Sequence, residues 1–331
     1  MIISRTPFRI SLFGGGTDYP TWVREHGGAV LGMAINKYCY ISVRPLPPFF
    51  EHRHRIVYSK VELVRDPSEI QHPAVRGVLT ALPVTDGLEI HHDADLPARS
   101  GLGSSSAFTV GLLHALNAFR GRMMTKRELS QSAIHIEQDV LHEAVGCQDQ
   151  IWATYGGLNH IEFRTDGEFE VSPLILPSER RAELQQSLML FFTGFSRYAT
   201  DFAQDQLNNI PRRTAQLSMM RQMVDQSLHI LRDERTPIRE IGKLLHEGWR
   251  LKRELADSVS TPQVDEIYEA ALSAGAIGGK LLGAGGGGFM VFFVEPENRE
   301  RLRERLRHLV HVTFDIDNQG SKIVLYQPDG L

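Results

Sequence analysis

A cluster of glycine and serine residues stands directly before a strongly apolar stretch in residues 96–116, LPARSGLGSSSAFTVGLLHAL. The apolar stretch predicts a helix that begins inside the cluster and runs toward Phe119. Glycine lets a backbone turn through positive φ, and the first four N–H groups of a helix lack partners within it. Because those groups also form the positive end of the helix dipole, the cluster favours a bound anion such as a phosphate. The alternative interpretation is a tight turn with an N-cap.

Two further glycine clusters occur, LFGGGTDYP at 12–20 and GAGGGG at 283–288. The second matches the dinucleotide-binding pattern G-x-G-x-x-G, but the strand-like FMVFFVEP follows it where that pattern needs a helix. It therefore predicts a loop whose bare backbone approaches another segment or a ligand. The P-loop pattern G-x-x-x-x-G-K-[ST] and the hydrolase pattern G-x-S-x-G are both absent, so neither of those chemistries is expected.

The chain of 331 residues is long enough for two domains or one large one, with the 42% hydrophobic residues of an ordinary globular protein. Its net charge of −4 argues against a nucleic-acid partner, and no window of about 18 uninterrupted apolar residues indicates a membrane span. Only two cysteines occur, and the first residues lack the features of a signal peptide, which predicts a cytoplasmic protein. The sequence leaves open whether the chain forms a homo-oligomer.

Short β-branched or alternating runs predict strands in both halves of the chain. They lie at 9–13, 28–35, 38–46, 55–64, 88–96, 156–163 and 188–194. A second helix is expected from Thr125, where TKRE indicates a capping box with Glu128, and the pattern of residues 201–273 is mostly helical. A further helix and terminal strands close the chain. The mixture predicts an α+β fold of two domains, residues 1–180 and 181–331.

Glu137 falls inside an apolar face of the helix that begins at Thr125. That face comprises Leu129, Ala133, Ile134, Ile136, Val140 and Leu141. A carboxylate there is costly to bury unless it is paired or binds a metal ion, and the alternative is a surface glutamate that extends to solvent. Asp149, at the start of the next predicted helix in GCQDQIWATY, is an N-cap by its simplest interpretation.

Two charged residues near the N-terminus also have simple structural interpretations. Arg9 alternates with apolar neighbours in TPFRISLF, so it would be a solvated strand residue. Asp18, in GGGTDYP, would shape the turn into a helix that has Pro20 in its first turn. Taken singly, these residues are weak signals.

Taken together, four segments of the chain resemble the GHMP kinases, a superfamily of small-molecule kinases that includes galactokinases and mevalonate kinases. The segments are TPFRISLFGGGTDY, LPARSGLGSSSA, HIEQDVLHEAVGCQDQ and GGKLLGAGGGGF. The motifs occur in the order of the family and span nearly the whole chain. The resemblance implies a two-domain α+β fold with a left-handed β-α-β crossover in the N-terminal domain, although such crossovers are generally right-handed in proteins. It also implies a ferredoxin-like C-terminal domain, an active site in the cleft, and the use of ATP and Mg²⁺.

The resemblance assigns roles to individual residues. It implies that the ATP phosphates are held by Ser100, Gly101, Leu102, Gly103, Ser104, Ser105 and Ser106, and that Mg²⁺ is bound by Ser105 and Glu137. Asp149 would be the catalytic aspartate, with Arg9 as the basic residue beside it. The substrate would contact Gly15, Gly16, Thr17, Asp18, Gly285, Gly286 and Gly287, while Arg197 and Lys280 are candidates for a remote sugar phosphate. GGGTDY stands where galactokinases have GEHTDY, which argues against galactose.

Within the superfamily, LFGGGTDYP and TGFSRYATDFAQDQ resemble the branch of D-glycero-D-manno-heptose 7-phosphate kinases and fucokinases. Fucokinases usually form one domain of longer chains, so the length of 331 residues favours the heptose kinases. The implied reaction transfers the γ-phosphoryl group of ATP to the anomeric C1 hydroxyl and gives the 1,7-bisphosphate, a precursor of GDP-heptose for surface glycans. The alternatives are a kinase for L-fucose or a hexose, and a non-catalytic sensor of ATP and sugar. The sensor is disfavoured, because a protein that does not transfer phosphate need not keep all four of Arg9, Ser105, Glu137 and Asp149.

Overall fold

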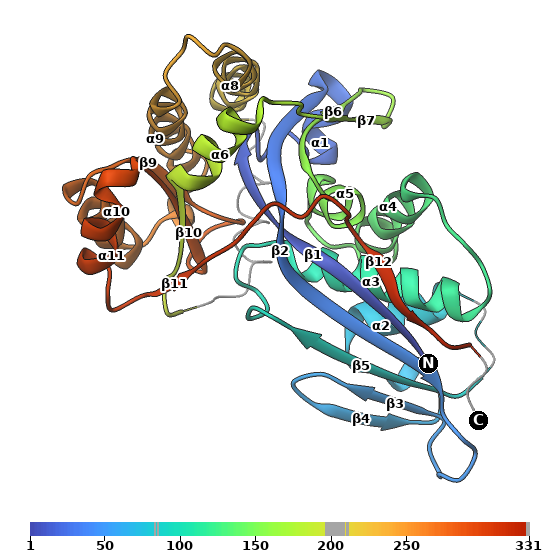
Figure 1. Ribbon diagram of the computed structural model, residues 1–331. Coiled ribbons are helices and arrows are strands. Elements are labelled where there is room, and N and C mark those ends of the chain that lie inside the picture. Colours follow the sequence, from blue (N-terminus) through green and yellow to red (C-terminus); the bar gives the residue numbers. More distant parts are fainter. Residues whose placement is uncertain (83, 85, 196–208, 210–211, 329–331) are drawn as a thin grey trace.

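The computed structural model describes residues 1–328 apart from 83, 85, 196–208, 210 and 211 (Figure 1). Within these residues the chain forms a large and a small β-sheet, each packed against helices, which is the α+β architecture expected from the sequence. Arg197 and most of TGFSRYATDFAQDQ lie outside the described residues. None of the described helices is long and apolar enough to cross a membrane.

The large sheet has eight strands among the described residues, in the order β12-β1-β2-β5-β3-β4, with β6 paired to β2 and β7 paired to β6. The strands are β1 (Ile2–Phe13), β2 (Gly28–Pro45), β3 (His54–Val57), β4 (Val61–Val64), β5 (Leu88–Ala94), β6 (Leu158–Phe163), β7 (Phe169–Pro173) and β12 (Lys322–Tyr326). The two strands expected at 28–35 and 38–46 are one continuous strand. Both halves of β2 pair with β1, across a bulge between Pro7 and Phe8, so no break is needed.

The helices of this part lie mainly on one face of the large sheet (Figure 1). They are α1 (Pro20–His26), η1 (Pro67–Glu69), α2 (Pro73–Ala81), α3 (Ser104–Phe119), α4 (Lys126–His135), η2 (Ile136–Val140) and α5 (Gln148–Tyr155). The capping box is confirmed, because the Thr125 hydroxyl accepts from the Glu128 N–H while the Glu128 carboxylate accepts from the Thr125 N–H. The short helix α2 was not expected from the sequence pattern.

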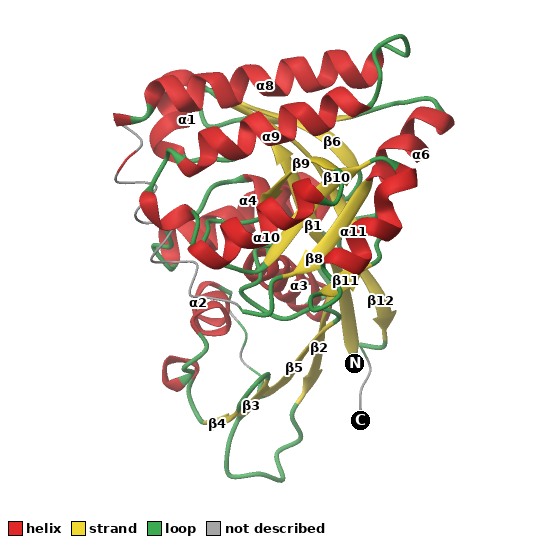
Figure 2. Ribbon diagram, turned by 90° about the vertical axis from the view of Figure 1, so that its left-hand side faces the viewer, coloured by secondary structure: helices red, strands yellow, loops and turns green. Residues whose placement is uncertain are grey.

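The small sheet is antiparallel, with the order β11-β8-β10-β9 (Figure 2). Its strands are β8 (Leu188–Phe192), β9 (Ala276–Leu281), β10 (Phe289–Val294) and β11 (Val310–Val312). The accompanying helices are α6 (Ser178–Ser187), α8 (Thr214–Arg232), α9 (Arg239–Arg253), η4 (Asp257–Val259), α10 (Pro262–Ser273), η5 (Pro296–Asn298) and α11 (Arg299–Arg305). Across the sheet, the neighbouring strands are the fourth, first, third and second of this part in chain order. Helices follow the first and the third strand in the chain, and this is the ferredoxin-like arrangement.

The division of the chain at residue 180 separates the strands of the two sheets with one exception. The last strand, β12, returns to the large sheet and pairs with β1, so residues 181–331 do not form one contiguous domain. Without β12, the outer edge of β1 would present unpaired backbone groups, which this pairing satisfies. The handedness of the crossover stays a prediction.

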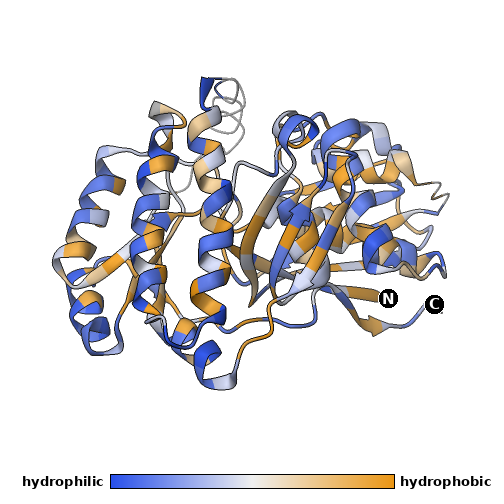
Figure 3. Cartoon of the chain, turned by 90° about the horizontal axis from the view of Figure 1, so that it is seen from above, coloured by the Kyte–Doolittle hydropathy of each residue, from blue (hydrophilic) through white to orange (hydrophobic). Residues whose placement is uncertain are grey.

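A continuous apolar core joins the two sheets. It contains residues of β1 and β2, such as Leu12 and Leu31, together with Leu217 and Val224 of α8 and Phe293 of β10. Figure 3 shows the helices carrying both apolar and polar residues, as expected of helices with one packed face. Because the core is shared, the glycine-rich loops at 12–20, 100–103 and 283–288 are held at fixed positions relative to one another.

Candidate active site

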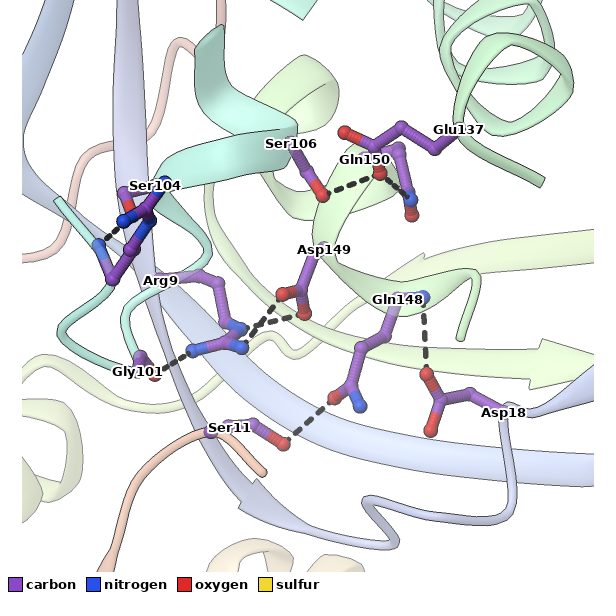
Figure 4. A network of polar contacts seen from close by, with 12 residues as sticks. Arg9, Ser11, Asp18, Gly101, Ser104, Ser106, Glu137, Gln148, Asp149 and Gln150 are labelled. Atoms are coloured by element: carbon purple, nitrogen blue, oxygen red, sulfur yellow. Dashed lines mark hydrogen bonds and ion pairs between the residues drawn. The ribbon is translucent and has the colours of Figure 1, made fainter. Parts of the chain in front are cut away.

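An arginine–aspartate pair lies at the centre of these loops (Figure 4). Arg9 of β1 contacts Asp149 of α5 through two parallel hydrogen bonds, Nε to Oδ1 and Nη2 to Oδ2, both of 2.7 Å. Its third nitrogen, Nη1, donates to the carbonyl of Gly101. Arg9 is 5% exposed, so its interpretation as a solvated strand residue is wrong. Asp149 is not an N-cap either, since Cys147 occupies that position of α5.

Asp18 lies near this pair and is buried. Its carboxylate accepts from the N–H of Gly16 at 2.9 Å and, at 3.4 Å, from the N–H of Gln148. Burial raises the pKa of Asp18, and the charge of Asp149 acts in the same direction. A Cβ at Gly146 would lie 1.8 Å from an oxygen of Asp18, so any side chain there would displace this carboxylate. Gly146 carries no motif signal by itself, and sequence reasoning missed it.

Thr17 holds the turn that carries Asp18. Its hydroxyl donates to the carbonyls of Gly14 and Ala29, at 2.8 and 2.9 Å, and the residue is fully buried. The hydroxyl is therefore engaged by the backbone. These two hydrogen bonds stabilise the loop, and the expected contact of Thr17 with the substrate stays a prediction.

The N-terminus of α3 is the expected phosphate cradle. Its N-cap is Gly103, in the left-handed region at φ +73°. No side chain in the described part of the chain caps the helix, so its first N–H groups remain available to an anion. Leu102 contributes only backbone, since its side chain is fully buried and its carbonyl accepts from the Arg9 N–H at 3.0 Å. Two of the serines stabilise the loop: the Ser100 hydroxyl donates to Pro97, and the Ser104 hydroxyl accepts from the Arg99 N–H.

Glu137 is fully buried beside this helix terminus, so its interpretation as a solvent-reaching surface glutamate is wrong. Its Oε2 accepts from the Ser106 hydroxyl at 2.8 Å and from the Gln150 amide, whereas Oε1 has no hydrogen-bond partner among the residues that the structure describes. Burial raises the pKa of Glu137 to about 7. Ser105, which is expected to bind Mg²⁺ together with Glu137, is exposed at the N-terminus of the helix, and its role stays a prediction. Adjacent helix residues point about 100° apart, and here the phase of α3 turns Ser106 toward Glu137.

Glu137 lies in a π-helical turn, η2, rather than in a regular α-helix. Such turns are rare and are frequent at functional sites. The wider turn changes the phase of the apolar face, so Val140 is partly exposed instead of packed as expected. A buried carboxylate with one orphaned oxygen and a hydroxyl beside it fits a hard cation such as Mg²⁺. The described residues contain no group of three or more His, Cys, Asp or Glu side chains placed to bind a metal ion. A cation here would therefore rely on ligand oxygens, as Mg²⁺ does when it binds phosphates.

The loop 283–288 packs directly against the loop that precedes α3. A Cβ at Gly101 would lie 2.3 Å from the carbonyl oxygen of Leu282, and one at Gly283 would lie 2.6 Å from Cα of Gly101. The Phe289 N–H donates to the carbonyl of Ser100 at 3.0 Å. The prediction that this bare backbone approaches another segment is confirmed. The segment it approaches is the phosphate loop itself.

Gly285, Gly286 and Gly287 all have positive φ. Side chains at two of them would meet neighbours of the second part of the chain: Val259 at 2.9 Å for Gly285, and the Phe195 ring at 2.5 Å for Gly287. Their expected role in closing over the substrate stays a prediction.

We expect Gly101→Ala to lower the free energy of unfolding by at least about 2 kcal/mol, because the methyl group meets a carbonyl at a left-handed φ. Gly121→Ala is the matched control, since Gly121 has φ +68° but nothing within 4 Å of its Cβ. In the Gly121→Ala variant, the free energy of unfolding should fall by only about 1 kcal/mol. Denaturant unfolding of both proteins measures the difference, and equal losses would contradict the proposed loop contact.

Two buried lysines of the second part of the chain complete the site. Lys280 of β9 donates to the carbonyl of Leu12 at 3.1 Å, and burial together with the charge of Arg9 lowers its pKa to about 8. Lys280 therefore lies near Arg9 and Asp18, and its expected contact with a remote sugar phosphate stays a prediction. Lys252 of α9 donates to the carbonyls of Leu281 and Gly283, and burial also lowers its pKa. Sequence reasoning missed Lys252, because a lysine in the charged helix WRLKRE resembles a surface residue.

The fold and these loops place the chain in a class of small-molecule kinases. Residues 70–157 match the GHMP kinases N terminal domain, and residues 234–311 match the GHMP kinases C terminal domain. These two segments together make up half of the chain. The chain belongs to the GHMP kinases and is a phosphotransferase of that family.

Several relatives are similar over most of the chain. A D-glycero-alpha-D-manno-heptose 7-phosphate kinase of Campylobacter jejuni is 27% identical over 326 residues, which cover 92% of this chain and 93% of that protein. A bifunctional fucokinase/GDP-fucose pyrophosphorylase of Arabidopsis thaliana is 28% identical, over 94% of this chain but 31% of that protein. Among solved structures, a D-glycero-D-manno-heptose 1-phosphate kinase from Bacteroides thetaiotaomicron has a TM-score of 0.79 at 25% identity, covering 97% of this chain and 98% of that one.

Proposed function

We propose that the protein is an ATP-dependent sugar kinase that phosphorylates the anomeric C1 hydroxyl of D-glycero-D-manno-heptose 7-phosphate. The observation that carries this proposal is the match to the Campylobacter jejuni heptose 7-phosphate kinase along nearly the full length of both chains. The fucokinase match, in contrast, covers less than a third of the longer relative. The product would be a heptose 1,7-bisphosphate, which we expect to serve GDP-heptose synthesis in the cytoplasm.

The acceptor sugar would lie between Asp18 and Asp149. Asp18 is held rigidly by two backbone N–H groups and can accept hydrogen bonds from sugar hydroxyls. Asp149 is the candidate base that accepts the proton of the attacking hydroxyl. Arg9 fixes the orientation of Asp149 through its paired hydrogen bonds. Positioning and charge stabilisation of this kind dominate phosphoryl transfer.

The phosphates of ATP would lie at the N-terminus of α3, where the N–H groups and the helix dipole favour negative charge. Glu137 and Ser105 are the residues that we expect to hold Mg²⁺, and the Ser106 hydroxyl, which donates to Glu137, would help to orient this carboxylate. When bound, Mg²⁺ neutralises charge that develops on the phosphate oxygens. Glu137 must be ionised for this role, which its pKa of about 7 allows near neutral pH.

ADP release from purified protein, with ATP and Mg²⁺ and a panel of acceptors, tests the proposal. The panel contains D-glycero-D-manno-heptose 7-phosphate, mannose, L-fucose and galactose. Turnover of the heptose 7-phosphate far above the other sugars is expected, with ³¹P NMR showing a new signal from a phosphate on C1. Preferred turnover of an unphosphorylated sugar would contradict the proposed substrate, and ATP binding without ADP release on any acceptor would favour the sensor.

We expect Glu137→Gln to raise the Mg²⁺ concentration for half-maximal rate by at least about 10-fold, because the amide lacks the negative charge that holds a cation. The KM for the sugar should change less than two-fold by the same argument. Glu143→Gln is a suitable control, since Glu143 is a nearby, partly buried carboxylate that also has a raised pKa. Equal effects of Glu137→Gln on both constants would indicate a structural role.

Cation binding by Glu137 should also depend on pH. Because burial raises the pKa of Glu137 from 4.5 to about 7, the folded protein holds this proton more tightly than the unfolded chain between those values. In EDTA, thermal stability should therefore fall as pH rises from 4.5 to 7, and less so in Glu137→Gln. With the metal present, the half-saturating Mg²⁺ concentration should rise as pH falls below 7. A pH-independent Mg²⁺ requirement in the unmodified protein would contradict this assignment.

A further inference from the structure

A cavity of about 320 Å³ lies between α6, β8, α11 and β11, where β11 forms one edge of the small sheet (Figure 2). Its polar lining comprises Gln185 and Gln186 of α6, Arg299 of α11, His311 of β11 and Thr313. Within the described part of the chain, no aspartate or glutamate is among the residues that line it. The volume is at the lower end of the range for ligand sites in proteins, so the cavity suits a small molecule.

This cavity is separate from the candidate active site. Leu188, which lines the cavity, begins β8 and pairs with Phe293, whereas Phe192 at the other end of β8 pairs with Phe289. Phe289 directly follows the glycine-rich loop 283–288. Four residue steps along a strand span about 14 Å, so the cavity and this loop lie at opposite ends of β8. A ligand in the cavity would therefore leave the N-terminus of α3 free for ATP.

Arg299 supplies the cavity with a positive charge that has no acidic partner among the described residues. Its Nη1 donates to the carbonyls of Gln186 and Leu188, the latter at 3.3 Å, which fixes the guanidinium in place. Its Nε and Nη2 donate no hydrogen bond to a residue that the structure describes. These two nitrogens form the edge through which Arg9 binds the Asp149 carboxylate. The same edge of Arg299 is therefore available to an oxyanion.

Nearby charges also favour an anion in the cavity. Burial lowers the pKa of Arg299, and the charge of Arg303 acts in the same direction. Burial likewise lowers the pKa of His311, and the charges of Arg303 and Arg299 add to this effect. Asp315, which lies just beyond the lining residues in the chain, is already engaged by the amides of Gln185 and Asn36. A bound anion would stabilise the positive charges that gather here.

We propose that this cavity binds a small molecule through a phosphate group, with the free edge of Arg299 as the main contact and His311 and Thr313 as further donors. A carboxylate has two oxygens, which the edge of one guanidinium satisfies by itself. A phosphate has further oxygens, and these can accept from the imidazole and the hydroxyl. The inference goes beyond the proposed function, because it does not depend on which acceptor the protein phosphorylates.

Calorimetric titration of the protein with inorganic phosphate tests the proposal, with a saturating non-hydrolysable ATP analogue present to occupy the N-terminus of α3. We expect one phosphate to bind, and Arg299→Lys to weaken its binding by at least about 10-fold, because lysine keeps the charge but lacks the paired N–H groups. His311→Phe should also weaken binding while it keeps the ring contact with Phe191. Arg307→Lys is the matched control, since Arg307 is 78% exposed, pairs with Glu304 and does not line the cavity. The affinity of the Arg307→Lys variant for phosphate should be unchanged.

The inference would be overturned if the unmodified protein bound no phosphate under these conditions, or if neither cavity variant weakened the binding. Acetate that binds as tightly as phosphate would overturn the assignment to a phosphate group. Circular dichroism shows whether each variant is folded, and His311→Phe decides the test if Arg299→Lys is not. Failure of the proposed function is distinguishable from all of these results, because ADP release on the panel of sugars is measured separately.

Discussion

Asp149→Asn is expected to lower kcat by about 100- to 10,000-fold, the usual contribution of a positioned base, while ATP binding is retained. Asparagine keeps the shape of the side chain and can accept one of the two hydrogen bonds from Arg9. It cannot accept a proton from the attacking hydroxyl. The folded site should therefore persist with its base removed, and the loss should appear in kcat rather than in the KM for ATP.

Steady-state ADP release and calorimetric titration with an ATP analogue measure the two quantities. Asp139→Asn is the control: it makes the same chemical change at an aspartate of η2 whose side chain is 68% exposed and pairs with His135. That variant should keep kcat within about two-fold, because exposed pairs contribute little. A near-normal kcat in Asp149→Asn would remove Asp149 from the mechanism.

Arg9→Met should destabilise the protein by about 2 kcal/mol and abolish measurable turnover, because it leaves Asp149, the partly exposed partner of the ion pair, without its counter-charge. Methionine has a comparable length and fills the space, so the loss reflects the missing charge and hydrogen bonds more than a cavity. Three acceptor atoms lose their donor: both oxygens of Asp149 and the carbonyl of Gly101. Denaturant unfolding measures the change in stability.

The double variant Arg9→Met/Asp149→Leu separates stability from activity. Replacing both partners of an ion pair that is mostly removed from solvent is often neutral, so the double variant should be more stable than Arg9→Met alone. Its turnover should stay abolished, since the candidate base is gone. If stability fell further in the double variant, the two residues would not interact as the geometry indicates.

Elements that depend on nearby residues were predictable from the sequence. Helix α3 and the capping box at Thr125 depend on patterns within one or two helical turns, and both lie where expected. The short helix α2 was missed, because nine residues that begin at Pro73 offer little periodicity. The π-helical turn at Glu137 was also missed, because its phase depends on packing against other elements rather than on its own five residues.

The candidate site shows the same limit at the level of single side chains. Strand alternation indicates that Arg9 points away from its apolar neighbours, but not what covers that side of the strand. The resemblance to a family supplied the missing partner, Asp149, and the structure brings the two together. It did not indicate that Ser106 donates to Glu137, because this contact depends on the phase of α3. The loop position of Gly146 and the buried Lys252 had no sequence signal at all.

By itself, the sequence determined the α+β class, the order of the glycine-rich motifs and the set of chemical groups, because each of these follows from local patterns. The tertiary structure alone decided which groups meet, because the partners are far apart in the chain. Ser106 and Glu137 are 31 residues apart, Arg9 and Asp149 are 140 apart, and Lys280 lies 268 residues from the Leu12 carbonyl that it contacts. Residues so far apart in the sequence come into contact only when β1, α3, α5 and the small sheet pack around one shared core.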